Sequence, residues 1–187
     1  MSINEVRYLP ECGSTNAYMK EHFEEFGPVG AVYTTNQTAG RGRLGRTWVN
    51  AEGKALYYTV AIREPLAQPA TLPLLASLAV RRQLALQGAA IDLEQDPGWL
   101  AEALTDFGFD RPLYTFARDG FAPFREEYKA ACVNIGRRVT FDLPDGGQGA
   151  GEAVDVDEEG RLVVRTDSGE EHVFTGEVSV RGIYGSL

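Results

Sequence analysis

The C-terminal part of the chain, from Arg137 onward, alternates apolar and polar residues in short runs, and this pattern limits the possible folds more than any other feature. A period of two is typical of strands that bury one face. Glycine-containing turn sequences separate the runs, which predicts antiparallel hairpins. The expected strands cover residues 137–143, 151–156, 161–166, 172–174 and 178–184. Five short strands in about fifty residues are typical of a small SH3-like barrel.

The part before Arg137 combines strand and helix patterns. Strands are expected at residues 6–9, 31–35 and 56–62. Ser14-Thr15-Asn16 supplies N-cap side chains for a helix that runs to about Phe26, where Gly27-Pro28 ends it. Further helices are expected at residues 71–87, from Asp96 to about 106 and from Pro123 to 136. The predicted fold class is therefore α+β, with a mixed sheet and helices over residues 1–135 and the barrel over residues 136–187.

Composition argues against several kinds of protein. The chain has 18 basic and 27 acidic side chains, a net charge of −9, so a phosphate backbone would be repelled and general nucleic-acid binding is not expected. No run approaches the roughly 20 apolar residues that cross a bilayer, and no secretion signal begins the chain, which predicts a cytoplasmic protein without membrane contact. Cys12 and Cys132 have no metal-ligand neighbours and are expected to be reduced thiols, while His22 and His172 stand alone in polar surroundings.

A segment with three glycines and three arginines lies between the second and third predicted strands. It reads Gln37-Thr38-Ala39-Gly40-Arg41-Gly42-Arg43-Leu44-Gly45-Arg46-Thr47-Trp48 and has neither a helical nor a strand period, which predicts a loop. Glycines let backbone amides approach an anion, and arginines supply forked donors, so the loop suits an acyl phosphate. A flexible basic loop or an RGG-like RNA contact is the alternative. The flanking strands, and a Trp48 expected to anchor the loop in a core, favour a loop that is tied to the sheet.

Three motifs in this order resemble the biotin protein ligases. Ser14-Thr15-Asn16 is similar to the family motif that contacts the ureido ring of biotin. The segment from Gln37 to Trp48 looks like the loop that orders over biotin and biotinyl-AMP, and Leu56-Tyr57-Tyr58-Thr59 looks like the strand that lines the biotin tail. The ending from Glu177 to Gly185 is similar to the family's C-terminal barrel. The resemblance implies a biotin/lipoate ligase-like fold; lipoate ligases themselves differ in the arginine motif.

The resemblance also implies an activity. Biotin and Mg-ATP would form biotinyl-5′-AMP, and a lysine of a biotin carboxyl carrier protein would take the biotinyl group. Arg41 and Arg43 would be the catalytic residues, and no protein ligand to a metal ion is predicted. The implied substrate-binding residues are Ser14, Thr15, Asn16, Gln37, Gly40, Arg41, Gly42, Arg43, Tyr57 and Thr59. The implied nucleotide-binding residues are Arg43, Arg46 and Trp48.

Ordinary structural roles stand beside these assignments. Ser14 has the alternative of being only a helix cap. Tyr57 and Thr59 could instead be ordinary strand residues. Arg46 could instead be a solvated surface charge.

The chain departs from the family after about Gly88, where a Lys-Trp-Pro-Asn-Asp strand and its neighbours are expected but not found. The three lysines of the chain are Lys20, Lys54 and Lys129, of which only Lys54 lies near the loop in sequence. We therefore expect weak or lost adenylation. The alternatives are a non-catalytic module that binds biotin, biotinyl-AMP or the carrier, and an engineered or decayed deletion form.

The same departure bears on assembly. A shortened sheet would either pair its remaining strands or bury the exposed edge in a homodimer. The Ser14 motif lies close to Met1, so no DNA-binding winged helix and no operator binding are expected.

Overall fold

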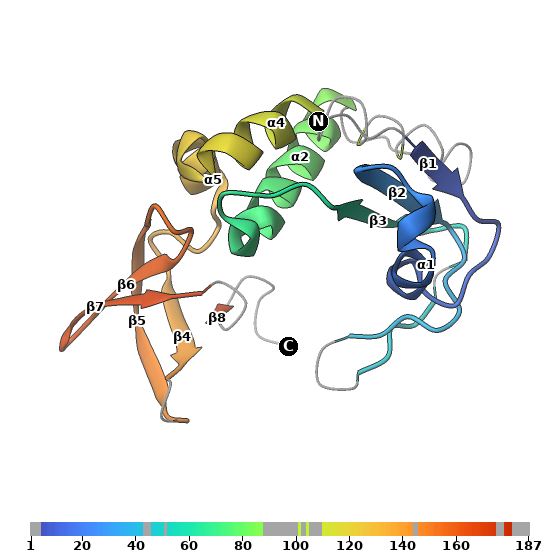
Figure 1. Ribbon diagram of the computed structural model, residues 1–187. Helices are drawn as coiled ribbons and strands as arrows, with labels where there is room; N and C mark the ends of the chain where they lie inside the picture. Colours follow the sequence, from blue (N-terminus) through green and yellow to red (C-terminus); the bar gives the residue numbers. More distant parts are fainter. Residues whose placement is uncertain are drawn as a thin grey trace. The chain divides into compact units, whose positions relative to one another are not determined.

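The computed structural model describes residues 5–42, 46–50, 52–87, 101, 104, 110–143, 146–174 and 178–180 (Figure 1). The chain divides into two compact units. The first comprises Met1–Leu66 and Ala76–Arg118, and the second comprises Ala67–Leu75 and Asp119–Leu187. The domain boundary between residues 135 and 136 that the sequence suggested remains a prediction.

A mixed three-stranded sheet forms the centre of the first unit. Its strands are β1 (Glu5–Tyr8), β2 (Val29–Thr34) and β3 (Tyr57–Ile62). β2 lies in the middle, parallel to β1 and antiparallel to β3. Five of its six residues are buried, which explains its nearly continuous apolar sequence, because a central strand covered on both faces has no solvated side. The three strands confirm the strand predictions for this part of the chain within two residues at each end.

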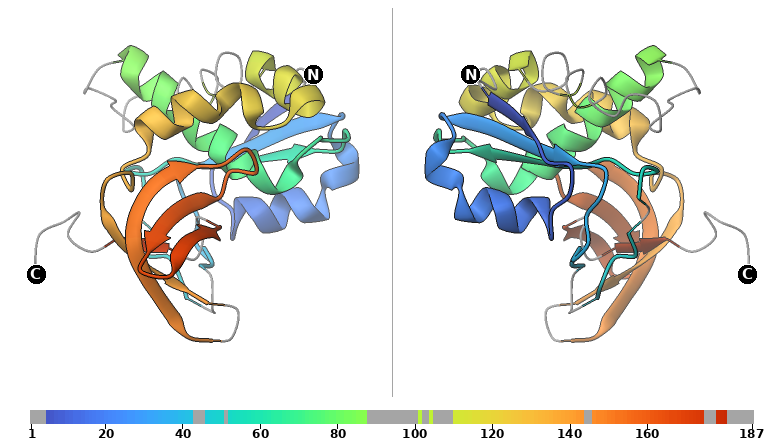
Figure 2. Two further views of the ribbon diagram at one scale, coloured as in Figure 1. Left: turned by 90° about the vertical axis from the view of Figure 1, so that its left-hand side faces the viewer. Right: turned by 90° about the vertical axis from the view of Figure 1, so that its right-hand side faces the viewer.

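Helices cover both faces of this sheet. α1 (Thr15–Glu21) packs against β2 and β3 on one face, while α2 (Leu72–Gln87) and α4 (Asp110–Asp119) lie on the other (Figure 2). Met19 of α1 joins Phe26 and Val32 in a buried apolar cluster beneath the sheet.

The helix predicted to run from the Ser14 motif to Phe26 is shorter than expected. α1 ends at Glu21, and a 3₁₀ turn, η1 (Phe23–Glu25), follows it. His22 caps the helix end with its backbone N–H on the Tyr18 carbonyl, and its ring stacks on Tyr18 and contacts Glu25 at 2.6 Å. The sequence suggested that His22 stands alone, but the structure gives it two side-chain neighbours, Tyr18 and Glu25.

Helix α4 is not among the helices predicted from the sequence. Its third residue is Pro112, and proline is tolerated in a first helical turn because the N–H that it lacks has no partner there. Leu113 and Phe116, three residues apart, are completely buried and face the core. The helix predicted from Asp96 to residue 106 lies outside the described residues apart from Ala101 and Leu104, which are both buried.

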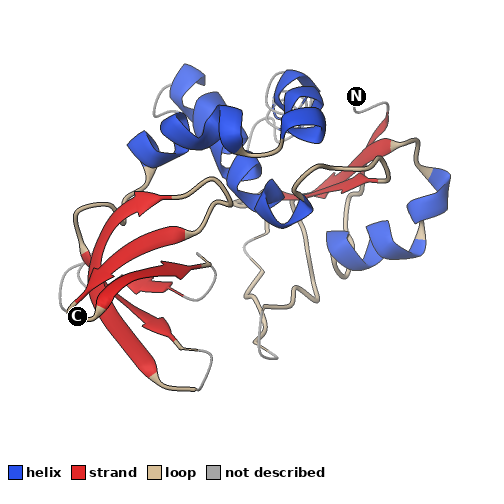
Figure 3. Cartoon of the chain, turned by 60° about the vertical axis from the view of Figure 1, so that its left-hand side comes forward, coloured by secondary structure: helices blue, strands red, loops and turns tan. Residues whose placement is uncertain are grey.

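The second unit contains a curved antiparallel sheet (Figure 3). The strands are β4 (Arg138–Asp142), β5 (Gln148–Val156), β6 (Leu162–Thr166), β7 (Gly169–Val173) and β8 (Val178–Val180). They pair in the order β7-β6-β5-β4-β8, with a bulge between Ala153 and Asp155. A strand is present at each of the five predicted places, but β7 begins at Gly169, three residues before the predicted start, and predicted strand residues 181–184 lie outside the described residues. The pairing among the described strands does not close into a ring.

Three short helical segments belong to the second unit. They are η3 (Pro69–Thr71), η5 (Ala122–Phe124) and α5 (Arg125–Ala131). The helix expected from Pro123 to residue 136 thus ends at Ala131, where Cys132 adopts an extended conformation. Arg125 donates to the Val156 carbonyl and to Asp155, and Lys129 also contacts Asp155, so α5 is fastened to β5.

Strand β5 begins at Gln148, three residues before the predicted start at Gly151, so it contains Gly149 as well as Gly151. A Cβ at Gly149 would lie 2.5 Å from the Phe141 ring, and one at Gly151 would lie 2.3 Å from the Arg165 carbonyl oxygen. Both positions therefore require glycine for close packing, as glycine within a strand often indicates.

Candidate functional site

The glycine- and arginine-rich segment forms a hairpin whose base is attached to the first sheet. The Thr38 and Ala39 amides donate to the Cys12 and Gly13 carbonyls at 3.0 and 2.7 Å. Further along, Gly42 N–H bonds to the Arg46 carbonyl and Trp48 N–H to the Gly40 carbonyl. The prediction of a loop tied to the sheet is confirmed. Residues 43–45 at the tip, including Arg43, lie outside the described residues.

The hairpin closes one side of a cavity of about 340 Å³ in the first unit. Residues from all three motifs line it: Ser14, Thr15, Asn16, Gln37, Arg41, Trp48, Leu56, Tyr57, Tyr58 and Thr59. Eight predicted site residues are thereby brought together. Gly40, Gly42 and Arg46 are not in the lining, although they belong to the same hairpin. The described lining combines hydroxyl, amide and aromatic groups with the guanidinium group of Arg41.

A hydrogen-bonded network forms one wall of the cavity. The Thr15 backbone N–H and hydroxyl both contact Gln37 Oε1, at 2.9 and 3.2 Å. Thr59 Oγ1 lies 2.9 Å from Thr15 Oγ1 and 2.8 Å from Asn16 Oδ1. Thr15 is buried, and buried hydrogen bonds are less exposed to competition from water. The network joins the N-terminus of α1, the start of the hairpin and strand β3.

Two glycines of the hairpin make room for protein side chains. A Cβ at Gly40 would lie 2.7 Å from Gln37 Nε2 and 3.2 Å from Trp48 Cβ. A Cβ at Gly42 would lie 3.3 Å from both Trp48 Nε1 and Arg46 Cβ. The sequence predicts that these glycines permit close approach of the backbone to a ligand. The structure adds that their missing side chains accommodate Gln37 and Trp48.

Trp48 does not anchor the hairpin in a core, which corrects the expectation from the sequence. Its side chain is 68% exposed, and Val49 beside it is 91% exposed. The indole instead lies along the glycine side of the hairpin and borders the cavity. The hairpin is held by backbone hydrogen bonds, so it has no need of a buried anchor.

Ser14 has both of the roles that the sequence suggested as alternatives. Its Oγ accepts a hydrogen bond from the Ala17 N–H at 3.5 Å, which makes it the N-cap of α1, and the same residue lines the cavity. Arg46 is exposed.

Two asparagines near the ends of the hairpin were missed. Asn50 Nδ2 donates to Asn36 Oδ1 at 2.7 Å, and Asn50 Oδ1 accepts from the Tyr57 hydroxyl at 3.3 Å. Asn36 in turn donates to Glu11 at 3.0 Å. These contacts join the two ends of the hairpin to β3. Their signal in the sequence is weak, because asparagine beside a loop usually indicates a turn.

None of the three lysines belongs to the described lining of the cavity. Lys20 and Lys54 are exposed, and Lys129 contacts Asp155 at 2.8 Å. Lys54 thus gains no support as a substitute for the expected catalytic lysine. Arg41 is the one cation among the described lining residues.

The described residues provide no protein cradle for a metal ion. Among the described residues, no group of three His, Cys, Asp or Glu side chains is close enough to hold one, and no described carboxylate lines the cavity. Cys12 and Cys132 are free thiols, as predicted. Burial, and then the Glu11 carboxylate, raises the pKa of Cys12, which keeps its thiol protonated near neutral pH.

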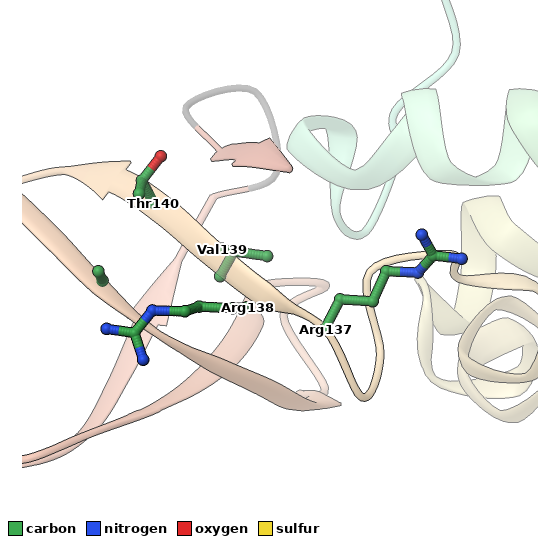
Figure 4. Close-up of a pocket in the computed structure, with 5 residues that line it drawn as sticks. Arg137, Arg138, Val139 and Thr140 are labelled. Atoms are coloured by element: carbon green, nitrogen blue, oxygen red, sulfur yellow. The ribbon is translucent and has the colours of Figure 1, made fainter. Parts of the chain in front are cut away.

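A second cavity, of about 510 Å³, lies along β4 in the second unit (Figure 4). Its lining residues are Arg137, Arg138, Val139, Thr140 and Ala150. The side chains of Arg137 and Arg138 point away from each other, so their guanidinium groups do not converge on a shared anion. The first cavity, where polar groups from three segments meet, is therefore the candidate functional site.

Comparison with known proteins identifies the class of protein to which this chain belongs. Residues 9–94 match the Biotin/lipoate A/B protein ligase family, and residues 135–181 match the Biotin protein ligase C terminal domain. The bifunctional ligase/repressor BirA of Bacillus subtilis is 20% identical over 213 residues, an alignment that covers 80% of this chain and 65% of that protein. The chain therefore belongs to the biotin protein ligase family, and it spans less than two thirds of the length of this relative.

Solved structures agree on the fold. The biotin protein ligase from Aquifex aeolicus, in complex with biotin and ATP, superposes with a TM-score of 0.73 and 20% identity, over 96% of this chain and 99% of that one. The biotin acetyl coenzyme A carboxylase synthetase from Helicobacter pylori, with bound biotinylated ATP, gives a TM-score of 0.56 and 14% identity over 89% and 99%. The biotin/lipoate ligase-like α+β fold is thus shown. No helix in the described part of the chain is long and apolar enough to span a membrane.

Proposed function

We propose that this chain binds biotin in the cavity between α1, the hairpin and β3, and that it uses ATP to form biotinyl-5′-AMP. The observation that carries the proposal is the convergence of three motif segments on one cavity of about 340 Å³. The polar wall at Thr15 and Gln37 suits the ureido ring, and Tyr57 and Thr59 of β3 suit the tail. A few polar groups held in place beside aromatic side chains are typical of sites that bind small molecules.

The proposed reaction has two steps. A carboxylate oxygen of biotin attacks the α-phosphorus of ATP, and pyrophosphate leaves with the electron pair of the broken P–O bond. The ε-amine of a lysine on a biotin carboxyl carrier protein then attacks the carbonyl carbon, AMP leaves, and the amine loses a proton. Neither step needs a covalent enzyme intermediate, so the protein contributes positioning and charge stabilisation.

Arginines have the central electrostatic role in this proposal. Arg41, at the cavity, would stabilise charge that develops between carboxylate and phosphate, with Arg43 as a second catalytic cation and Arg46 supporting the nucleotide. The exposed Trp48 ring would stack on the adenine. Mg²⁺ would arrive with the ATP phosphates, and no step is assigned to it.

Slow adenylation is part of the proposal because no lysine is found in the described lining. Removal of one preorganised donor commonly lowers a rate by about 100-fold to 1,000-fold. The same proposal places the protein in the cytoplasm, with a biotin carboxyl carrier protein as its partner. Formation of a homodimer remains a prediction.

The test is direct. The protein is incubated with biotin, Mg-ATP and a carrier protein, biotinyl-AMP is measured by mass spectrometry, and carrier biotinylation is measured by blotting. Arg41→Ala should lower adenylate formation at least about tenfold, while Lys20→Ala, which removes an exposed cation of α1, should not. Lys54→Ala should also leave the rate unchanged. Turnover at an ordinary ligase rate would contradict slow adenylation, and absence of biotin binding would exclude the function.

A non-catalytic binding module is the second candidate, favoured by the same absence of lysine from the described lining. It predicts that calorimetry detects biotinyl-AMP while mass spectrometry detects no new adenylate. Adenylate that accumulates over many turnovers would exclude it.

A further inference from the structure

The side-chain amide of Asn36 has a direction that its carboxylate neighbours impose. Asn36 Nδ2 lies 3.0 Å from Glu11 Oε2 and 3.5 Å from Glu52 Oε1. A carboxylate at neutral pH can only accept hydrogen bonds, so the amide nitrogen faces the carboxylates and the amide oxygen faces away from them. The Asn36 backbone is anchored as well, because its N–H donates to the hydroxyl of the buried Thr34 at 3.0 Å. The amide oxygen of Asn36 therefore has a fixed side, which is the side of Asn50.

This direction passes to the next amide along the chain of contacts. Asn50 Nδ2 lies 2.7 Å from Asn36 Oδ1, and only a donor can face that oxygen. With its nitrogen placed there, Asn50 has its own oxygen on the other side, 3.3 Å from the Tyr57 hydroxyl. That oxygen can only accept, so the Tyr57 hydroxyl donates its proton to Asn50. The four side chains thus form one series of hydrogen bonds with a single direction, which starts at the carboxylate of Glu11.

The last member of the series lies in the wall of the candidate site. Tyr57 lines the cavity of about 340 Å³. Side chains alternate across a strand, so Tyr57 is on the same face of β3 as Thr59, whose hydroxyl contacts Thr15 of α1. Asn36 precedes the hairpin and Asn50 follows it, so the two ends of the hairpin are joined to each other where they hold the tyrosine. The place of the Tyr57 ring in the wall therefore depends on a carboxylate that is not among the described lining residues.

We propose that Asn36 and Asn50 are positioning residues that hold the Tyr57 side chain in the cavity wall, and that the Glu11 carboxylate sets the direction of the hydrogen bonds by which they do so. The inference goes beyond the proposed function, and only its ligand-binding measurement rests on that function. Neither asparagine touches the ligand. Because the proton of the Tyr57 hydroxyl is engaged with Asn50, this hydroxyl does not supply a proton in either step of the reaction.

A wrong atom at position 50 should break the series while the size of the side chain stays the same. Asn50→Asp introduces a carboxylate that can still accept from Tyr57 but that places a second acceptor 2.7 Å from Asn36 Oδ1. Asn36 cannot turn to relieve this conflict while the Glu11 carboxylate holds its nitrogen. Two acceptors that face each other lose their hydrogen bonds to water without gaining a partner. The side chain at position 50 must then move away, and the Tyr57 ring loses its fixed place.

Glu11→Gln should remove this conflict. The amide introduced at position 11 can donate as well as accept, so Asn36 can turn by half a turn, accept from position 11 and donate to the carboxylate at position 50. Glu52→Gln is the matched control, because it also removes one negative charge beside the Asn36 amide but leaves Glu11 in place. Recovery that comes only from weaker charge repulsion would appear in both backgrounds, whereas recovery through a reversed amide requires Glu11→Gln.

The experiment measures the effect of Asn50→Asp at neutral pH in the wild-type, Glu11→Gln and Glu52→Gln backgrounds. Calorimetry gives the dissociation constant for biotin, and circular dichroism gives the urea midpoint of unfolding. Asn50→Asp should weaken biotin binding about tenfold in the wild-type and Glu52→Gln backgrounds, and about twofold or less in the Glu11→Gln background. The urea midpoint should fall in the same order. Equal losses in all backgrounds, or equal recovery with Glu11→Gln and Glu52→Gln, would overturn the inference.

A measurement on the unliganded wild type decides the direction of the series if Asn50→Asp fails to fold. With ¹⁵N-labelled protein, the side-chain N–H₂ protons of Asn50 should show nuclear Overhauser contacts to the Asn36 β-protons and not to the ring protons of Tyr57. The opposite pattern would mean that the Asn50 amide is reversed, and it would contradict the proposal. If the wild type does not bind biotin, the proposed function fails, while the urea midpoints and the spectra still decide this inference.

Discussion

Gly40 illustrates how a single residue controls the candidate site. Its position in the motif suggested contact between backbone and ligand, whereas the structure shows that its missing side chain leaves space for the Gln37 amide and the Trp48 Cβ. Both neighbours border the cavity. A side chain added at Gly40 would therefore disturb the cavity through these two neighbours.

Gly40→Ala should weaken biotin binding by about tenfold or more while leaving the protein folded. The added methyl group would lie 2.7 Å from Gln37 Nε2, so the amide must move away from its place beside the cavity. Calorimetry measures the binding and circular dichroism the fold. Gly53→Ala is unsuitable as a control because Gly53 has a φ of 71°. Ala39→Ser is a better one, and equal losses in the two variants would contradict the steric argument.

Ser14→Ala should lower the free energy of unfolding by about 0.5 to 1 kcal/mol, because the helix loses its N-cap. The 3.5 Å distance from Ser14 Oγ to the Ala17 nitrogen indicates a weak cap, which places the effect at the lower end of the usual range. Urea unfolding measures it. Ser14→Asp, whose side chain can still cap the helix, should have nearly the wild-type free energy of unfolding. If Ser14→Asp is as unstable as Ser14→Ala, Ser14 does not act as a cap.

At the scale of secondary-structure elements, one arginine connects β1 to the segment that follows α1. Arg7 donates to Glu5 at 2.7 Å and to Glu25 at 2.9 Å, and its guanidinium carbon lies 4.4 Å from the centre of the Phe26 ring. Hydrogen bonds to the Tyr18 hydroxyl, Glu25 and Glu5 raise the pKa of Arg7. β1 is short and has one sheet neighbour among the described strands, so side-chain contacts are important for holding it.

Arg7→Ala should destabilise the protein by about 1 to 2 kcal/mol, since a cation–π contact and partly buried ion pairs are lost together. Arg7→Lys keeps the charge but cannot form the forked contacts, and it should recover less than half of the loss. Hydrogen exchange of the β1 amides should accelerate in both variants. Unchanged exchange and stability in Arg7→Ala would show that β1 is held by its backbone pairing alone.

The turn between β5 and β6 is organised around Asp157. Burial alone would raise the pKa of this carboxyl, but hydrogen bonds from His172 and from the backbone and side chain of Arg161 lower it below its ordinary value. His172 Nδ1 lies 2.6 Å from Asp157 Oδ2, so this histidine, like His22, has a carboxylate neighbour and does not stand alone. Asp157 also accepts from the Glu159 amide at 3.1 Å.

Asp157 should make the protein sensitive to acid. A carboxyl group whose pKa is lower in the folded protein than in the unfolded chain stabilises the folded protein. This stabilisation is complete at pH values above the pKa in the unfolded chain, about 3.9, and it is lost as the pH falls through the pKa in the folded protein. Asp157→Asn should therefore reduce the fall in unfolding free energy below about pH 4, measured by urea titration. Asp167→Asn, at an exposed turn position, is the control. Equal pH profiles for wild type and Asp157→Asn would contradict this role.

At the scale of the whole molecule, the acidic balance of the chain decides how it meets other polymers. Its formal net charge is −9 and its sequence pI is about 4.8. Binding to duplex DNA depends mainly on neutralised phosphates, and a strongly acidic chain supplies few of the required cations.

A fluorescence anisotropy titration with a labelled DNA duplex should therefore show no binding at about 150 mM salt up to micromolar protein, and at most weak binding at about 50 mM. A basic protein of similar size serves as the positive control. Specific binding that persists as the salt concentration rises would contradict the prediction, because it would require a dedicated basic surface.

Local chemistry in the sequence was sufficient to predict much of this protein. The period of two predicted a strand at each of the five C-terminal places. The composition of the segment from Gln37 to Trp48 predicted a loop, and the strands on either side of it predicted that the loop is tied to the sheet. Ser14 was recognised as a helix cap because capping depends on residues only a few positions apart. These features are encoded within short windows, so they can be interpreted without knowledge of distant contacts.

The tertiary structure alone decided the features that depend on partners far away in sequence. Thr15 meets Gln37 across 22 residues and Thr59 across 44, so no local pattern shows that these side chains form one polar wall. Gly149 packs against the ring of Phe141 on the neighbouring strand, and Trp48 is 68% exposed although its sequence position suggested a core anchor. Short-range preferences thus determined the elements and motifs, whereas packing between distant segments determined the polar wall of the cavity and the exposure of its rim.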